Sequence, residues 1–189
     1  MLHQPFLSGL VLPPVEMPPP ASRDLRHWPD VSAETVCQHA RRLGTAGELL
    51  FDAQMLCFGE TPLDPGEFFP FDRLILRAPR ALRVQIKSVI MPAERGGYSV
   101  EPRKGYRGSP RGIRRYEDGD FDLLAIVLLR ESVMERCSAE KAPRYHIPLA
   151  SIEQLRRDPR ASFDSAMAAL DAAARDGTAP DASSAPAPY

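Results

Sequence analysis

The sequence has little cysteine, little histidine and no long hydrophobic run. Its three cysteines form no C-x-x-C pair and its four histidines show no ligand spacing. A disulfide framework or a structural zinc site is therefore not expected. The longest apolar stretch, residues 123–129, is far shorter than the roughly 20 residues that a membrane-spanning helix needs. The first residues also lack the basic and apolar regions of a signal peptide. We expect a cytoplasmic protein with no membrane partner.

An excess of charge of one sign is absent as well. The chain has 24 basic and 25 acidic residues and a net charge of −1, so overall charge does not indicate a nucleic-acid binder. Proline, in contrast, is abundant, at 20 of 189 residues against a usual share of ~5%. Residues 1–31 hold seven of these prolines and predict an extended arm, whereas residues 176–189 predict a disordered tail. Residues 32–175 are then expected to form one domain.

Two helices are predicted at the start of that domain. Ser32 is a suitable N-cap for a helix through Leu43, and Gly44 is expected to interrupt it. A second helix is predicted from about residue 45 to residue 58, with Gly59 as its stop and a loop after it at residues 60–69. The apolar stripe expected to face the core of this second helix consists of Ala46, Leu49, Ala53, Leu56 and Cys57.

Strand patterns follow, and a helix ends the domain. The last helix is predicted from an N-cap at Asp158 to Gly177. A helix pair, several strands and a final helix predict an α/β or α+β fold around one mixed sheet, and we expect α/β, with about five strands flanked by helices. The strand candidates are residues 71–77 and 82–89, which read as a hairpin, and residues 98–101, 122–129 and 145–149.

The strand at residues 82–89 carries the most informative polar side chains. Side chains alternate along a strand, so Gln85 and Lys87 share the face opposite the apolar set. Asp72 lies thirteen residues before Gln85, and a short hairpin turn would bring its carboxylate to the same face. Glu48, on the preceding helix, could point there too. Carboxylate and amide oxygens suit a hard cation such as Mg²⁺, and the lysine could orient a water or neutralise a phosphate. The side chains expected in the core are Leu82, Val84 and Ile86.

In their order, these residues resemble the PD-(D/E)XK nuclease superfamily. The variant with glutamine in place of the second acid looks most like the PD-(D/E)XK endonucleases associated with group I introns. The resemblance covers residues 44–150 and implies a restriction-endonuclease-like core. It rests on Gly44-Thr-Ala-Gly-Glu48, Pro70-Phe-Asp72, Arg83-Val-Gln-Ile-Lys87, Tyr116 and Asp122 before an apolar strand, and Tyr145-His-Ile-Pro148.

The resemblance implies a role for each matched residue. Asp72 would be the principal metal ligand, Glu48 an outer ligand, and Gln85 a ligand through its side-chain carbonyl. The backbone carbonyl of Ile86 would be a further ligand, and Lys87 would position the attacking water. The implied cofactor is Mg²⁺, with Mn²⁺ as a substitute, and the implied reaction is phosphodiester hydrolysis in DNA. The glutamine removes one negative charge and is expected to weaken metal binding.

Three further residues are candidates for a supporting or additional role in the site. Asp122 matches a position of the family pattern, where it could either take part in catalysis or brace the sheet. Tyr116 matches another and would support the site. Glu67 lies five residues before Asp72 and is a second candidate ligand.

A basic segment precedes the strand at residues 122–129. It has six basic residues, no acidic one between them, and interleaved Gly, Pro and Tyr. Long cations among residues with small side chains are typical of a segment that follows a phosphate backbone, although a solvated loop has the same composition. The predicted DNA-binding residues are Arg103, Lys104, Arg107, Arg111, Arg114 and Arg115.

Several functions remain open at this point. The sequence favours a Mg²⁺-dependent DNA endonuclease, which could be site-specific, restriction-like, or a junction or repair nuclease. A DNA-binding module that kept the fold and lost hydrolysis is the alternative that Gln85 supports. A protein-interaction domain with a basic loop would make the ordered matches coincidental. Cutting both strands with one site per chain calls for a homodimer or a higher oligomer.

Overall fold

The computed structural model describes residues 23–78, 80–93, 96–105, 110, 112–117, 119–138 and 142–177. Most of the predicted arm and almost all of the predicted tail lie outside these ranges. Among the described residues no helix is both long and apolar enough to cross a membrane. The elements are η1 Leu25–His27, α1 Ala33–Gln38, α2 Ala40–Cys57, β1 Pro62–Leu63, β2 Arg73–Ile75, β3 Leu82–Val89, β4 Tyr98–Val100, β5 Leu123–Leu128, β6 Val133–Ser138, β7 Tyr145–Ile147, α3 Leu149–Arg157 and α4 Ala161–Gly177.

Five strands form the central sheet in the order β1-β2-β3-β5-β6. β3 and β5 are parallel, and the other neighbouring pairs are antiparallel, so the sheet is mixed. β4 and β7 pair separately as a small antiparallel sheet. The predicted α/β fold, with a mixed sheet of five strands flanked by helices, is confirmed.

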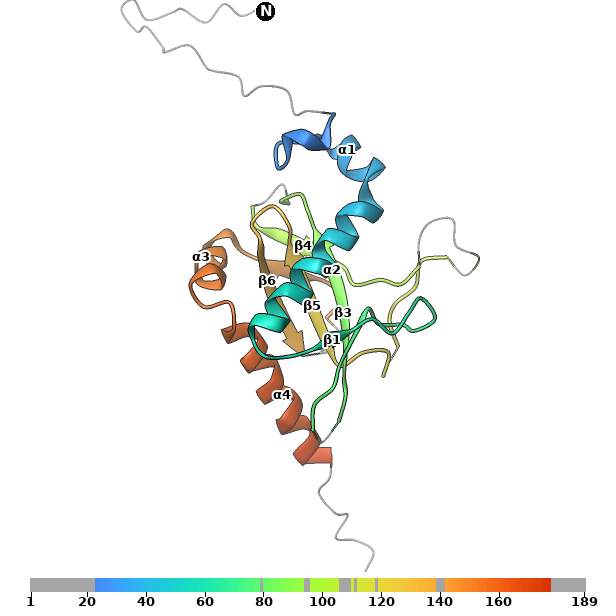
Figure 1. Cartoon of the computed structure of the whole chain (residues 1–189), viewed down its shortest axis with the longest axis vertical. Coiled ribbons are helices and arrows are strands. Elements are labelled where there is room, and N and C mark those ends of the chain that lie inside the picture. The colour runs from blue at the N-terminus through green and yellow to red at the C-terminus, as the bar shows by residue number, and fades with distance from the viewer. Residues whose placement is uncertain are drawn as a thin grey trace, which may run out of the picture.

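Two apolar cores lie on opposite faces of the central sheet. On one face, Phe51 of α2 and Phe163 of α4 pack against core-facing side chains of β2, β3 and β5. Figure 1 shows α2 crossing in front of the sheet, with α4 below it. On the other face, Ile152 and Leu155 of α3 and Tyr98 of β4 cover alternate residues of β5. Burial on both faces explains why β5 is an unbroken apolar run.

The predicted hairpin forms from β2 and β3, although β2 spans residues 73–75 and not the predicted 71–77. Arg73 pairs with Val84 and Ile75 with Leu82, and β3 has the predicted bounds, residues 82–89. The predicted inward-facing residues Leu82, Val84 and Ile86 belong to the core beneath α2.

The first two helices differ from the prediction in where the break lies. Ser32 does cap α1, since its hydroxyl oxygen accepts from the backbone N–H of Thr35 at 3.2 Å. The helix ends at Gln38, however, and His39 forms the junction. α2 then runs without interruption through Gly44, so the predicted break there is wrong. One glycine costs a helix only about 1 kcal/mol, which the tertiary packing of an 18-residue helix outweighs.

The apolar stripe predicted for α2 is wrong as well. Leu49 and Leu56 are 61% and 59% exposed, and Cys57 is exposed. Helical spacing alone allows more than one stripe on this sequence, and contact with the sheet selects a different one. The buried residues of α2 are Leu43, Gly47, Phe51 and Met55.

The sequence interpretation missed four elements. η1 lies within residues 1–31, predicted as an extended arm, β1 lies within residues 60–69, predicted as loop, and β6 and α3 were not predicted. β1 has only two residues and α3 only nine, so each carries a weak periodic signal. The predicted cap at Asp158 is confirmed, because its carboxylate accepts from the backbone N–H of Ala161 at 3.1 Å, where α4 begins.

Candidate active site

Asp72 lies immediately before β2 and faces the middle of β3. Its backbone N–H donates to the carbonyl of Val84 at 2.9 Å, which continues the hairpin pairing. Its carboxylate oxygen Oδ2 accepts from the backbone N–H of Ile86 at 2.7 Å and from the side-chain amide of Gln85. The hairpin therefore brings Asp72 next to Gln85 and Ile86, which follow it by thirteen and fourteen residues in sequence.

Gln85 is buried, with 4% of its surface exposed. Its amide nitrogen donates both to Asp72 and, at 3.1 Å, to the backbone carbonyl of Ile86. The nitrogen end of the amide, and not the predicted carbonyl oxygen, thus faces Asp72. The oxygen would take its place by a 180° turn of the terminal amide group.

Lys87 lies two residues farther along the same face of β3. Its ammonium nitrogen is 5.3 Å from the centre of the Tyr116 ring, and it forms no hydrogen bond to a described residue. Burial lowers the pKa of Lys87, and attraction by Asp72 and Glu48 offsets part of that effect. A cation so placed, with unused donors beside two carboxylates, is available to bind a water or a phosphate oxygen.

Glu48 reaches the cluster from α2. Its carboxylate lies 3.2 Å from the guanidinium of Arg73. Burial and then repulsion by Asp72 raise the pKa of Glu48 above its usual value in spite of Arg73. Burial also raises the pKa of Asp72, although the Ile86 N–H and Lys87 act in the opposite direction. Both carboxylates would be stabilised by an additional positive charge between them.

Gly47 explains how Glu48 comes so close to β3. A Cβ atom at Gly47 would lie 1.9 Å from the hydroxyl oxygen of Ser88 and 3.1 Å from its Cβ, so any larger residue would clash. α2 therefore packs directly on β3 at this point. The short distance between α2 and the sheet requires a glycine at position 47. That distance in turn sets how far Glu48 lies from the sheet.

The sequence interpretation missed two functional candidates, Arg73 and Asp52. Arg73 is 7% exposed, and its guanidinium donates to both carboxylate oxygens of Asp52 at 2.8 to 3.1 Å and to the backbone carbonyl of Asp72 at 2.7 Å. The signal was present: Glu48 and Asp52 are four residues apart on one helix and so share a face. A buried arginine next to Asp72 is the partner that such a carboxylate pair requires.

A cleft of about 540 Å³ opens beside Glu48 and Asp72, between α2 and the loop before β2. Glu67, the second candidate ligand, lines this cleft, but its side chain is 92% exposed and pairs at 3.8 Å with Arg41. It therefore lies at the rim of the cleft and not with the buried cluster.

Asp122 is fully engaged with Arg83. Its two carboxylate oxygens accept from the Arg83 guanidinium at 2.8 and 3.0 Å, and one also accepts from the Arg83 backbone N–H at 2.9 Å. Burial by itself would raise the pKa of Asp122, but these hydrogen bonds outweigh it and hold the pKa below its usual value. Of the two roles left open for Asp122, this geometry supports the brace between β3 and β5.

Tyr116 stands between the cluster and the basic segment. Its ring packs edge-on against Phe121, with centroids 5.0 Å apart, and lies near the ammonium groups of both Lys87 and Lys104. Burial, followed by the nearby Asp72 and Asp120 charges, raises the pKa of Tyr116, so its hydroxyl stays protonated. Tyr116 thus forms a wall of the site.

The predicted DNA-binding residues are in different environments. Lys104 is mostly buried and pairs with Asp120 at 2.7 Å, so its charge is neutralised within the protein. Arg103 is half exposed and pairs with Glu101, whereas Arg115 is exposed and lines a cavity. The backbone of Arg114 pairs with that of Lys104. Arg107 and Arg111 lie outside the described residues.

Comparison with known proteins yields a structural match. Neither a family model nor a curated protein matches this sequence. The fold is similar to that of a bacterial homing endonuclease. That endonuclease, I-Ssp6803I, is 20% identical in sequence to the present chain. The match has a TM-score of 0.50 and covers 57% of the present chain and 76% of the endonuclease chain. At that identity the match shows the fold, and the PD-(D/E)XK assignment remains a resemblance.

The donor set of the cluster is compatible with one hard cation. Glu48 and Asp72 offer carboxylate oxygens, and Gln85 and Ile86 offer an amide and a backbone carbonyl oxygen. Such oxygens suit Mg²⁺ or Mn²⁺. Within the described ranges, no three His, Cys, Asp or Glu side chains form a metal site, so a cation here would depend on the two neutral oxygens.

Proposed function

We propose that this chain is a metal-dependent DNA endonuclease. The observation that carries the proposal is the convergence of Asp72, Lys87 and Glu48, from the residue before β2, from β3 and from α2, on a fold shared with a homing endonuclease. Two carboxylates beside a lysine without a hydrogen-bond partner among the described residues are the groups that phosphodiester hydrolysis requires: ligands for a cation, and a donor for water or phosphate.

The metal site in this proposal consists of Asp72, Glu48, Gln85 and the backbone carbonyl of Ile86. Bound Mg²⁺ or Mn²⁺ would neutralise charge on the scissile phosphate and acidify a bound water. The Ile86 N–H holds Asp72 in place from the backbone, at 2.7 Å. Arg73 holds Glu48. The chain itself therefore preorganises both carboxylates for their role.

In the hydrolysis step, Lys87 orients the attacking water. The water oxygen bonds to phosphorus as the P–O bond on the opposite side breaks, the water loses a proton, and the leaving oxygen gains one. Burial has lowered the pKa of Lys87, which makes a proton transfer through its ammonium group easier than for an exposed lysine. The exposed Arg103 and Arg115 would contact DNA phosphates near this position.

One observation favours an alternative, a DNA-binding module without hydrolysis. Gln85 donates a hydrogen bond to Asp72, and Arg73 pairs with Glu48, so each carboxylate is already compensated by a protein group. A protein of this kind would bind DNA without needing a metal. A junction or repair nuclease would use the same site with a different DNA shape.

The test is cleavage of supercoiled plasmid and of a synthetic four-way junction in Mg²⁺, Mn²⁺ or EDTA. Nicking that requires metal and is lost in Lys87→Ala and Asp72→Asn supports the nuclease. Asp171→Asn and Arg175→Ala, on the exposed side of α4, are the matched controls and should retain it. Nicking that persists in Lys87→Ala and Asp72→Asn would refute this site. DNA binding without nicking would favour the binding module.

We further propose that the chain acts on duplex DNA as a homodimer or a higher oligomer, since one chain has one such site. Sedimentation of the protein alone and on a DNA duplex measures this. A single copy per duplex would contradict double-strand cleavage.

A further inference from the structure

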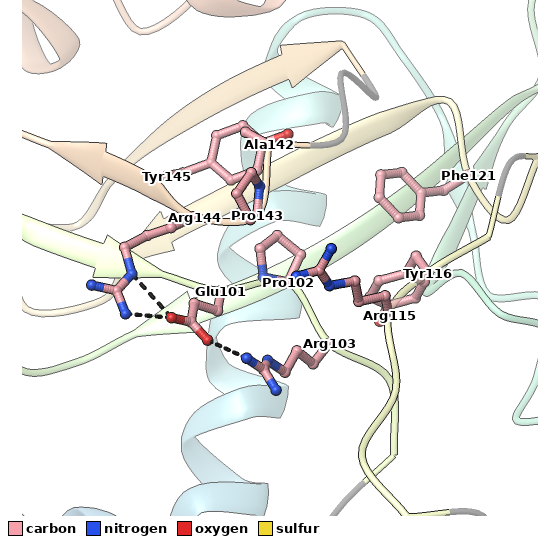
Figure 2. Close-up of a pocket in the computed structure, with 10 residues that line it drawn as sticks. All are labelled: Glu101, Pro102, Arg103, Arg115, Tyr116, Phe121, Ala142, Pro143, Arg144 and Tyr145. Carbon is pink, nitrogen blue, oxygen red and sulfur yellow. Dashed lines mark hydrogen bonds and ion pairs between the residues drawn. The ribbon is translucent and has the colours of Figure 1, made fainter.

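A second cavity has Tyr116, the neighbour of Lys87, as one of its walls. Its volume is about 410 Å³, and the residues that line it come from three places: the segment after β4, Arg115, Tyr116 and Phe121 before β5, and residues 142–145, which lead into β7. Figure 2 shows these side chains, with Arg115 extending from the Tyr116 side toward Pro102. The volume is at the lower end of the ~300–1,000 Å³ that small-molecule sites occupy. It can hold one nucleotide and is too small for a helix or a duplex.

The described residues that line the cavity carry a net positive charge. Among them, Arg103, Arg115 and Arg144 outnumber the one acid, Glu101. Arg144 donates to one carboxylate oxygen of Glu101 through two nitrogens, and Arg103 donates to the other at 2.7 Å. Arg115 has no ion pair or hydrogen bond to any residue that the structure describes. Its guanidinium is therefore available to an anion such as a phosphate.

The hydrogen bonds among the described residues leave Glu101 one acceptor position. A carboxylate has about four lone-pair sites, and three of those of Glu101 are used by the two arginines, two of them on Oε1 and one on Oε2. The remaining site on Oε2 can accept from an N–H group of a ligand. The hydrogen bonds from Arg144 and then Arg103 hold the pKa of Glu101 below its usual value, so the carboxylate is charged at neutral pH.

The remaining walls are aromatic or apolar. Tyr116, Phe121 and Tyr145 contribute rings, and Pro143 and Ala142 lie beside Tyr145 (Figure 2). Flat apolar walls next to arginines are the surroundings in which proteins stack an unpaired nucleobase while holding its phosphate. Tyr116 also contacts Lys87, at 5.3 Å from its ammonium nitrogen, so the cavity and the candidate active site share one wall.

We propose that this cavity binds a single nucleotide of the DNA strand, extruded from the stack next to the bond that is cut. Arg115 binds its phosphate, the rings contact its base, and Glu101 accepts from the base edge. In this proposal Glu101 accepts from an exocyclic amino group, which adenine, cytosine and guanine have and thymine lacks; thymine offers its ring N3–H alone. The inference rests on the proposed function for its DNA substrate, and its test is independent of hydrolysis.

The experiment titrates the full chain, in EDTA, with each of the four deoxynucleoside 5′-monophosphates and with inorganic phosphate. Binding is measured by calorimetry and by saturation-transfer NMR. We expect dAMP, dCMP and dGMP to bind several-fold more tightly than dTMP and than phosphate. Arg115→Ala should weaken binding at least tenfold. Glu101→Gln should remove the preference over dTMP, since an amide both donates and accepts. Arg175→Ala, which removes one arginine from α4, should bind as the unmodified chain does.

Three results would overturn the inference. The first is that no mononucleotide binds. The second is that phosphate and dCMP bind equally, which would show an anion site alone. The third is that Arg115→Ala leaves binding unchanged. Asp171→Asn, on the exposed side of α4, should bind the mononucleotides normally. A chain that binds them but never nicks DNA would refute the proposed nuclease and leave the nucleotide site standing.

Discussion

The guanidinium of Arg73 lies 3.2 Å from the carboxylate of Glu48 and 2.8 Å from that of Asp52. One buried cation on β2 thus holds two carboxylates of α2, which are one helical turn apart. The same guanidinium donates to the backbone carbonyl of Asp72. Arg73 therefore links the helix that carries Glu48 to the strand segment that carries Asp72, and it sets the distance between the two candidate ligands.

Arg73→Ala is expected to destabilise the protein by about 3 kcal/mol, because it leaves two carboxylates uncompensated. This value is at the lower end of the free-energy loss expected when one partner of a buried ion pair is removed, because the Glu48 side chain is one-third exposed. Arg73→Lys should lose less, as it keeps the charge without the forked geometry. Urea denaturation of both variants beside Arg175→Ala measures this. A loss below about 1 kcal/mol in Arg73→Ala would contradict the bridging role.

Gly47→Ala is expected to cost about 1–3 kcal/mol, because its Cβ would meet the hydroxyl of Ser88 at 1.9 Å. The clash should push α2 from β3 and move Glu48, so any nicking activity should fall even where the protein stays folded. The double variant Gly47→Ala with Ser88→Ala removes the closest contact and should recover part of both losses. Thermal melting and plasmid nicking are the two readouts.

Gly44→Ala is the matched control for that prediction. It lies on the same helix three residues earlier, and a Cβ there would have nothing within 4 Å. Alanine is the better helix former, so this variant should be more stable than the unmodified chain, by up to about 1 kcal/mol. Equal effects at Gly44 and Gly47 would show that helix propensity, and not contact with β3, decides both.

Gln85→Glu tests the metal site through stability. In EDTA, a second carboxylate next to Asp72 replaces a hydrogen-bond donor by a repelling charge, so the melting temperature should fall. Mg²⁺ should then raise the melting temperature of Gln85→Glu more than that of the unmodified chain, because ligands stabilise in proportion to their affinity. Gln85→Met, with no charge and no donor, should show no such gain. Equal Mg²⁺ shifts in all three proteins would place the cation elsewhere.

Asp122→Asn tests the brace by its pH dependence. The folded-state pKa of Asp122 lies below its unfolded value of ~3.9. Its contribution is therefore fully present above the unfolded pKa and is lost as the pH falls through the folded pKa. We expect Asp122→Asn to be about 1 kcal/mol less stable at neutral pH, a modest figure because Arg83 is one-third exposed. Urea denaturation should show this difference shrinking below about pH 4. A constant difference from pH 7 to pH 3 would exclude the charged brace.

Local patterns predicted the hairpin well and α2 poorly. From Leu82 to Ile86 every second residue of β3 is apolar, and a period of two admits a single inward face, so the core residues Leu82, Val84 and Ile86 followed. α2 is rich in alanine and leucine all round. Its inward face depends on where the sheet lies, and the stripe at Leu49 and Leu56 proved to be solvent-exposed.

The amino-acid order by itself determined that Asp72, Gln85 and Lys87 would share one face of a hairpin, since strand alternation and a short turn are local properties. Only the tertiary structure decided that Arg73 and Asp52 would join them and that Lys104 would be neutralised by Asp120. It also decided that Tyr116 would both lie next to Lys87 and line a second cavity. Such pairings join residues from different elements, and the distance between elements is set by packing, as at Gly47 against Ser88, which no local pattern encodes.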